Sequence, residues 1–164
     1  MESLTVPDGP NPGEVVKEGF NVLDLGCGSG AVGFAAAFRA ANVRVHAIDA
    51  NARAIECTRD GAIKNGLTQH TTQLEAEGRC EQPREFDLVL ANPPYFSNFK
   101  IGEIFLFAAQ RALRPGGRAH FVTKQPTWYA EQFTLIFDDV SVREIRGYYI
   151  IKGTQRPPTG HENW

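Results

Sequence analysis

From Phe20 onward, short apolar segments alternate with segments of helical pattern, and this alternation restricts the fold more than any other feature. The apolar segments are FNVLDL, VRVHAID, TTQLEAE, EFDLVLAN and RAHFVTK, of which TTQLEAE is the weakest. Such alternation is typical of a parallel sheet built from crossover units, in which a helix joins each strand to the next. The chain is therefore predicted to be an α/β protein with a doubly wound, mostly parallel sheet.

The end of the chain has a different pattern. In DVSVREIRGYYIIKGT, two alternating runs meet near Gly147 with no room for a helix between them, so they should pair as an antiparallel hairpin. The full prediction is a seven-stranded Rossmann-like sheet with a C-terminal antiparallel hairpin. Helices are expected over residues 31–42, 51–66, 101–113 and 126–137.

The length of 164 residues suits a single domain. Residues 1–19 contain several prolines and glycines and are expected to form a flexible leader, residues 20–155 the domain, and residues 156–164 a tail. The 42% hydrophobic and 22% charged content is that of an ordinary soluble protein, and no apolar run is long enough to cross a membrane. Three cysteines without CxxC spacing predict a reduced, cytoplasmic protein, and no metal site is expected.

Charge divides unevenly along the chain. Residues 1–98 hold 8 basic and 13 acidic side chains, whereas residues 99–164 hold 9 and 6. The later part, at +3, could attract a polyanion such as RNA, but an uneven solvated surface explains the same counts equally well.

A glycine loop, GCGSG, follows the first predicted strand and precedes a helix. Glycines let the backbone approach a ligand closely, and a helix N-terminus offers unpaired N–H groups. The candidate contacts are Gly26, Cys27, Gly28 and Gly30. Their spacing also fits the dinucleotide-binding pattern, so the loop alone leaves open whether a dinucleotide or another adenosine-containing ligand binds.

Two acidic residues accompany the loop. Asp24 interrupts an otherwise apolar strand, and a charge buried there needs a partner, which a cationic amino group of a ligand or the backbone N–H groups of the loop would supply. Asp49 ends the next strand, where it would bind ribose hydroxyls or simply cap the following helix. Both strand ends should lie on the same edge of the sheet.

The strand EFDLVLAN ends at that edge with Asn92, which is followed by Pro93, Pro94 and Tyr95. At these positions the chain resembles the class I S-adenosylmethionine-dependent methyltransferases. VLDLGCGSG looks like their cofactor loop, AIDAN like their ribose site, and NPPY like the catalytic motif of those that methylate conjugated amino groups.

The motif has a chemical rationale. An amino nitrogen conjugated to a ring or carbonyl is a poor nucleophile, because its lone pair is delocalised. If the Asn92 side chain and the Pro93 carbonyl accept its two N–H bonds, the nitrogen is held for in-line attack on a methyl group. The prolines stiffen the loop, and Tyr95 can stack on the flat substrate. Asn92, Pro93, Pro94 and Tyr95 are therefore the predicted catalytic residues.

The resemblance also implies the remaining cofactor contacts. Ala50 lies within the ribose-site motif, and Glu75, with Glu77 as an alternative, matches the position near the adenine. Asn92, at the same edge, is a predicted cofactor contact as well as a predicted catalytic residue. Cys27 is interpreted as a small space-filler, because methyl transfer from a sulfonium needs no thiol.

Three substrate classes share the motif: guanine amino groups in ribosomal RNA, adenine amino groups in DNA or RNA, and glutamine side chains of release factors. The sequence is most similar to the small-domain enzymes that modify guanine in ribosomal RNA, in which a lysine follows an aromatic residue in the last strand, as Lys152 follows Tyr149 here. The resemblance thus implies an RNA substrate and leaves room for a protein partner that supplies substrate recognition. A dinucleotide-binding oxidoreductase stays as the alternative from another class, although it gives no role to NPPY.

Overall fold

The computed structural model describes residues 15–77, 79–81, 83–94 and 99–160. The predicted helices and strands are present, and their bounds are β1 Asn21–Leu25, α2 Ala31–Ala37, β2 Arg44–Asp49, α3 Ala52–Lys64, β3 His70–Leu74, β4 Phe86–Ala91, α4 Phe99–Ala112, β5 Leu113–Thr123, α5 Pro126–Ile136, β6 Phe137–Ile145 and β7 Tyr148–Gln155. Among these described elements, no helix is long and apolar enough to cross a bilayer.

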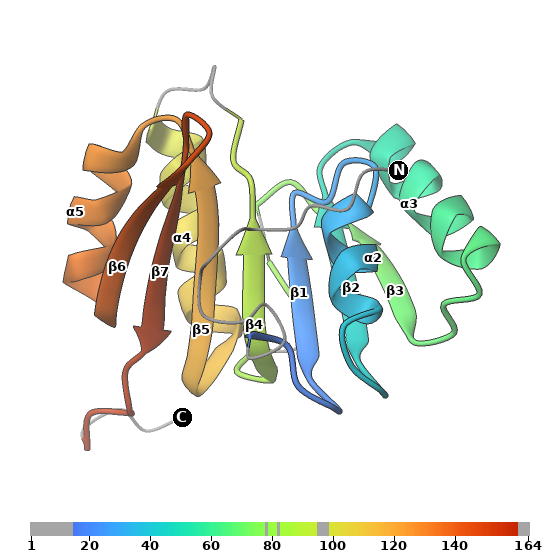
Figure 1. Cartoon of the computed structure of the whole chain (residues 1–164), viewed down its shortest axis with the longest axis horizontal. Helices are drawn as coiled ribbons and strands as arrows, with labels where there is room; N and C mark the ends of the chain where they lie inside the picture. Colours follow the sequence, from blue (N-terminus) through green and yellow to red (C-terminus); the bar gives the residue numbers. More distant parts are fainter. Residues whose placement is uncertain (1–14, 78, 82, 95–98, 161–164) are drawn as a thin grey trace.

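One seven-stranded sheet has the order β3-β2-β1-β4-β5-β7-β6 (Figure 1). The first five strands in this order pair in parallel, whereas β7 is antiparallel to both β5 and β6. This confirms the predicted doubly wound sheet with its C-terminal antiparallel hairpin. The strand order reverses between β1 and β4, and ligands of such sheets bind at the carboxyl ends of the strands beside this reversal.

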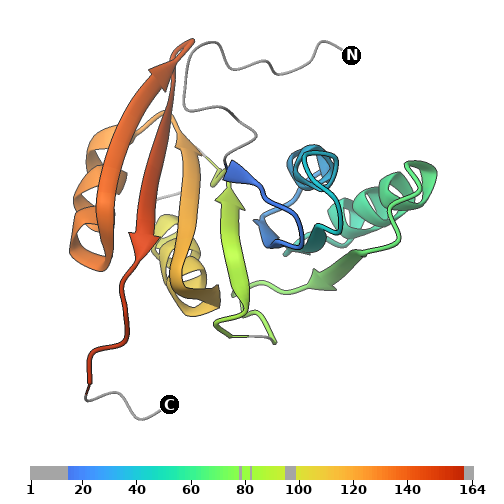
Figure 2. The same cartoon turned by 60° about the horizontal axis from the view of Figure 1, so that its bottom comes forward.

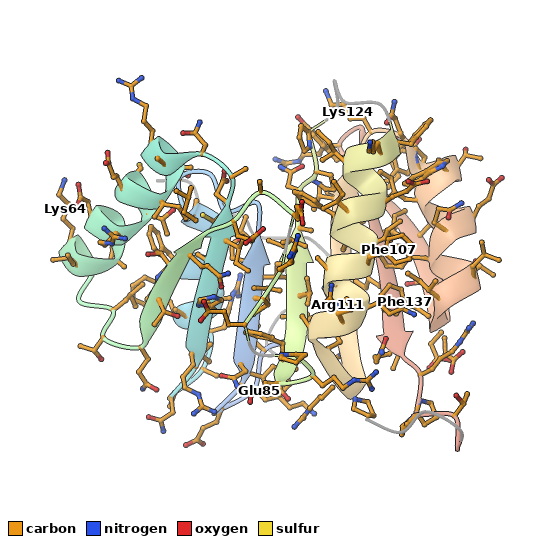
Figure 3. The ribbon with its side chains drawn as sticks, turned by 180° about the vertical axis from the view of Figure 1, so that it is seen from behind. Lys64, Glu85, Phe107, Arg111, Lys124 and Phe137 are labelled. Carbon is orange, nitrogen blue, oxygen red and sulfur yellow. The ribbon has the colours of Figure 1, made fainter. Side chains whose placement is uncertain are left out.

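Helices cover the two faces of the sheet in different places. α2 packs on β1 and β2 and α3 on β2 and β3, on the face that contains Asp24. α4 and α5 pack on β4, β5, β6 and β7 from the other side, and they stand in front of the strands when the molecule is seen from behind (Figure 3). Figure 2 shows the same layer, with α4 and α5 behind the strands β5, β7 and β6.

The main core lies between α4, α5 and the sheet. Phe121 of β5 packs edge-on against Phe133 of α5, with ring centroids 5.1 Å apart, and Phe133 contacts Phe137 at 5.0 Å. These three rings and Ile151 of β7 are fully buried. Burial of each such side chain stabilises the fold by roughly 1.5–3 kcal/mol, so this cluster fixes the C-terminal hairpin against α5.

Three element boundaries differ from the prediction by three residues or more. The first helix ends at Ala37 rather than at residue 42. β3 ends at Leu74, opposite Asp49, because the strand it pairs with ends there. β5 begins at Leu113, which pairs with Phe86 before the ladder resumes between Leu88 and Arg118. Residues 114–117 therefore form an irregularity in the strand that the sequence pattern assigned to a turn.

Candidate active site

A cavity of about 300 Å³ opens at the carboxyl ends of β1, β2, β3 and β4. Its lining comes from four strand ends and from α4, and consists of Leu25, Gly26, Ile48, Asp49, Ala50, Glu75, Ala76, Asn92, Pro94, Ile101, Ile104 and Phe105. The predicted residues Gly26, Asp49, Ala50, Glu75, Asn92 and Pro94 thus meet around one space. Its size and its mixture of apolar walls with a few polar groups are those of a small-molecule site.

Gly26 lines this cavity directly after the end of β1. Its φ is +71°, a conformation that side chains disfavour, and a Cβ added to it would lie 2.8 Å from the Phe105 ring. The N–H groups of Gly26 and Cys27 both donate to the Ile48 carbonyl, at 2.8 and 3.0 Å. The start of the loop is therefore tied to the end of β2, and only glycine leaves room for Phe105 beside it.

The Asp49 side chain also holds the loop in place, through hydrogen bonds. One carboxylate oxygen accepts from the Gly28 N–H at 2.9 Å, and the other accepts from the Asn51 N–H, also at 2.9 Å. An ionised carboxylate has about four acceptor positions. Two therefore remain for hydroxyl donors in the cavity that Asp49 lines, so the capping and ligand-binding interpretations of this residue are compatible.

Asp24 lies beneath the loop and is not among the residues that line the cavity. It is 3% exposed, and its carboxylate accepts from the Gly33 N–H of α2 at 3.1 Å. The backbone N–H that bonds Asp24 thus comes from the first turn of α2, directly after the loop, rather than from GCGSG itself. Burial raises the pKa of Asp24 to about 6; the Gly33 N–H opposes the rise and the Asp49 carboxylate adds to it.

Cys27, Gly28 and Gly30 are likewise part of the loop without lining the cavity. The Cys27 thiol is buried against Thr58 of α3, with 3.4 Å between sulfur and the hydroxyl oxygen. Burial raises the pKa of this thiol to about 11, so it is protonated and a poor nucleophile near neutral pH. This environment agrees with the interpretation of Cys27 as a space-filling residue.

Thr58 is a loop contact that the sequence did not reveal. Its hydroxyl donates to the Gly28 carbonyl at 3.1 Å, and its side chain is fully buried. A Cβ on Gly30 would lie 2.9 Å from the Thr58 methyl group. In the sequence, Thr58 is one of several polar residues of the helix predicted over residues 51–66, and nothing distinguishes it from the others.

Asn92 follows directly after β4, and its exposed side chain lines the cavity together with Pro94. Pro93, between them, is buried. β4 ends at Ala91. Pro93, two residues later, has no backbone N–H to donate and so cannot continue the pairing. Tyr95, the fourth predicted catalytic residue, lies outside the described residues.

Glu75 is placed at the cavity by β3. Its N–H donates to the Asp49 carbonyl at 3.0 Å, and its carboxylate accepts from the Glu77 N–H at 2.9 Å. The two candidates for the position near the adenine therefore belong to one turn, in which Glu75 lines the cavity and Glu77 does not.

One wall of the cavity is apolar and comes from α4. Ile101, Ile104 and Phe105 belong to the helix that the sequence predicted over residues 101–113. They were not predicted as site residues, because a stripe of apolar side chains facing a core and one facing a cavity have the same spacing.

Comparison with protein families gives one match, in which the model of the family described as methyltransferase small domain covers residues 14–152. A protein of Bacillus subtilis, YbxB, is 32% identical over 136 residues, which are 80% of this chain and 68% of that protein. Ribosomal RNA large subunit methyltransferase G of Shewanella amazonensis is 28% identical over 138 residues, or 80% of this chain and 36% of the relative.

Among solved structures, a 16S rRNA methyltransferase (RsmC) of T. thermophilus, in complex with AdoMet and guanosine, superposes with a TM-score of 0.74. The sequence identity is 24%, and the match covers 85% of this chain and 38% of that one. The likeness therefore supports the fold. The chain spans little more than a third of the length of either RNA-modifying relative.

Proposed function

The chain belongs to the methyltransferase small domain family, and on that premise we propose that it transfers a methyl group from S-adenosylmethionine to a guanine exocyclic amine in ribosomal RNA. S-adenosylmethionine is the cofactor of this methyltransferase fold, which decides between the two kinds of adenosine-containing ligand that the glycine loop alone allowed. We further propose residues 20–155 as the methyltransferase domain and the cytoplasm as its location.

The cavity fits this cofactor chemically. Ile48, Ile101 and Phe105 supply apolar walls for a planar base, and the Asp49 carboxylate keeps acceptor positions for ribose hydroxyls. Gly26 lets the ligand approach the backbone. Glu75 would bind the ligand near its base, and Ala50 leaves space at the ribose. When bound, S-adenosylmethionine supplies an electrophilic methyl group attached to a sulfonium.

Asn92 and Pro93 would hold the acceptor amine. The Asn92 side-chain oxygen and the Pro93 carbonyl each accept one N–H, so that the nitrogen lone pair is directed into the cavity. The same bonds stabilise the positive charge that develops on nitrogen as it is alkylated. Pro93 and Pro94 limit the movement of these acceptors, and Tyr95 would stack on the base. The observation that carries the proposal is that Asp49, Glu75 and Asn92 line one cavity.

Ribosomal RNA is preferred as the substrate because relatives with RNA-modifying names match most of this chain. The whole protein, with any partner that helps to recognise RNA, is covered by the same proposal. Glutamine and adenine acceptors remain chemically compatible with the Asn92 site.

The direct test has two stages. Calorimetric titration compares S-adenosylmethionine with NAD, and we expect saturable binding of S-adenosylmethionine only. Labelled methyl transfer is then followed into ribosomal RNA, DNA and protein fractions, and into matched RNA transcripts that contain either guanosine or inosine. Inosine lacks the exocyclic amine, so we expect label in the guanosine transcript alone.

Label in the inosine transcript would refute the guanine amine as acceptor. Label confined to the protein fraction would assign the enzyme to glutamine side chains, and label confined to adenine would assign it to the adenine class. Binding of NAD without S-adenosylmethionine would overturn the cofactor assignment as well.

A further inference from the structure

Basic side chains gather on one face of the strands β5, β7 and β6. In the antiparallel pairing, Arg118 is opposite Thr154, His120 opposite Lys152, and Arg143 opposite Ile150. Paired residues of antiparallel strands project on the same side, and alternate residues of one strand share a face. Arg118, Lys124, Arg143 and Lys152 therefore share one side of the sheet, called here the basic face.

The basic face is the side opposite the helices α4 and α5. Phe121 and Ile151 alternate with its residues and point the other way, into the core beneath α5. Figure 3 looks at the helix-covered side, and Figure 1 looks at the basic face. One side of these three strands is thus apolar and buried, whereas the other carries these four cations and one acidic residue, Asp138, which pairs with Thr154 and forms an ion pair with Arg156.

The cations on this face are close enough to affect one another. The pKa of Lys152 is lowered, first by burial and then by the positive charges of Arg118 and Arg143. Lys152 thus lies near two like charges, and a bound anion would favour its charged form.

His120, beside Lys152 in the pairing, adds an independent observation. The residue is 8% exposed, and its Nε2 atom has no hydrogen-bond partner among the described residues. Burial, Lys152 and Arg118 lower its pKa to about 3, so the ring is neutral near pH 7. A buried polar atom without a partner is costly, and an oxygen or hydroxyl of a bound molecule would satisfy it.

The basic face leads to the active-site edge of the sheet. At the carboxyl end of β5, the Lys124 ammonium lies 4.8 Å from the centre of the Tyr148 ring, and Tyr148 is 39% exposed. From Arg118 to Lys124 the strand extends roughly 20 Å, at about 3.3 Å per residue. That length is enough for several nucleotides of a single strand. Cations along a surface with an aromatic ring at its end are typical of proteins that bind the nucleic-acid backbone.

We propose that the basic face binds the sugar-phosphate backbone of the RNA substrate and guides it over Lys124 and Tyr148 toward Asn92. The choice of RNA as the polyanion rests on the proposed function. Arg118, Arg143 and Lys152 contact phosphates, and His120 bonds a phosphate oxygen or a ribose hydroxyl. The surface contributes affinity for the backbone and no base specificity.

The test measures binding of a fluorescein-labelled 12-nucleotide oligouridylate to the full chain over a range of salt concentrations. This probe contains no guanine, so the result does not depend on methyl transfer. The variant Arg143→Gln/Lys152→Gln removes two cations from the basic face. The matched control Arg59→Gln/Lys64→Gln removes two exposed cations from α3, at the opposite end of the sheet from β6 and β7 (Figure 1).

Each lost phosphate contact should reduce the slope of log affinity against log salt by about 0.7 for a single strand, so the double variant should lose about 1.4. We also expect its binding at 0.1 M salt to weaken on the order of tenfold. The α3 control should keep the slope of the unaltered protein. S-adenosylmethionine affinity, measured in parallel, should be the same in all three proteins.

Equal slopes in the two double variants would overturn the proposal. So would equally tight binding of an oligoglutamate peptide of the same charge, which would assign the face to an acidic protein. If the double variant does not fold, Lys152→Gln with Lys64→Gln as its control repeats the test, with half the slope change. Methyl transfer to an unexpected substrate, with the slope change intact, would refute the proposed function alone.

Discussion

The two halves of the sheet differ in the hydrogen-bond partners of their polar groups at the predicted ligand sites. In the half formed by β3, β2 and β1, the carboxylates beside the glycine loop have backbone partners: Asp24 accepts from Gly33, and Asp49 accepts from Gly28 and Asn51. His70, at the start of β3, is different, because neither of its ring nitrogens has a partner among the described residues. In the half formed by β4, β5, β7 and β6, the Nε2 atom of His120 has no partner among the described residues. The carboxylates at the cofactor loop are thus already bonded within the protein, whereas on the basic face a polar atom of His120 is left for a ligand to satisfy.

This contrast suggests that the two halves bind different reactants. The first half holds the cofactor through backbone groups and acids, and the second holds the methyl acceptor through an amide and cations. Damage to the second half should then stop methyl transfer without releasing the cofactor. Damage to the first half should alter stability and cofactor affinity together.

The largest effect is expected from Asn92→Ala. The exposed side chain can be removed without exposing the core, but one of the two acceptors that position the amine is lost. Methyl transfer should fall by about a thousandfold, the upper part of the range for a positioned transition-state contact. The S-adenosylmethionine dissociation constant should change less than about twofold, because Asn92 is assigned to the acceptor.

Single-turnover transfer and calorimetric titration measure the two quantities separately. If Asn92→Ala weakened cofactor binding as much as it lowered activity, the assignment of cofactor and acceptor to different halves would be wrong. Unchanged transfer would remove Asn92 from the mechanism.

The second-largest effect is expected in the pH dependence of the unfolding free energy, and it arises from the ionisation of Asp24. Its pKa is raised from 3.8 to about 6 in the folded protein, so the folded state binds the proton more tightly than the unfolded state. The resulting stabilisation is fully present below pH 3.8 and is lost as the pH rises through about 6. The 2.2-unit difference corresponds to at most about 3 kcal/mol.

Asp24→Asn removes this titration and keeps an oxygen that can accept from Gly33. Relative to the variant, the original protein should therefore lose roughly 2.4 kcal/mol of unfolding free energy between pH 4 and pH 7. Denaturant unfolding at several pH values checks this. Parallel pH profiles of the two proteins would show that Asp24 ionises normally.

Gly26→Ala should give a smaller effect, concentrated on the cofactor. The new Cβ would lie 2.8 Å from the Phe105 ring in the cavity, at a φ of +71°. Strain of this kind costs about 1–3 kcal/mol, and S-adenosylmethionine binding should weaken about thirtyfold through the crowded cavity floor.

Gly28→Ala is the matched control, because its φ is +55° and its Cβ would meet nothing within 4 Å. Like Gly26→Ala, it should lower the free energy of unfolding through backbone strain, but it should keep most of the cofactor affinity. Equal losses of affinity in both variants would mean that backbone strain, rather than cavity shape, controls binding.

The smallest effect is expected at Cys27. Its raised pKa of about 11 leaves the thiol protonated at pH 7, so exposed Cys57 should react with iodoacetamide well before Cys27 does. Cys27→Ala should keep methyl transfer within about twofold and cost about 1 kcal/mol of stability. Mass spectrometry of the labelled protein and an activity assay test both parts, and a hundredfold loss of transfer would give Cys27 a chemical role.

The sequence placed residues of both halves at one edge of the sheet, and Gly26, Asp49, Asn92 and Pro94 line one cavity there. The glycine loop, Asp24 and Asp49 are adjacent in sequence to the strands that position them, so local patterns were enough. Thr58 reaches the loop from 30 residues away, and the helical stripe with Ile104 and Phe105 could not be assigned to a cavity from its spacing. The basic face combines residues 118, 124, 143 and 152, which antiparallel register alone brings together.

The same reasoning explains the errors in element boundaries. A strand can extend only as far as its neighbour, so β3 stops opposite Asp49, which its own composition could not indicate. At β5, the Arg114 guanidinium forms an ion pair with Asp87, and a Cβ at Gly117 would lie 2.9 Å from the Phe86 carbonyl. The segment RPGG thus follows β4 closely, although its composition is that of a turn.

The position of β7 between β5 and β6 has a consequence for the order of folding. β6 precedes β7 in the chain but reaches the sheet only through it. During synthesis, β5 therefore has an open edge until residues 148–155 emerge, and an open edge can pair with a foreign strand. Ile151 also joins the buried Phe133 and Phe137 rings only at that stage. The second half of the sheet thus closes in one late, non-local step, while the β1 to β3 half can form from short-range contacts beforehand.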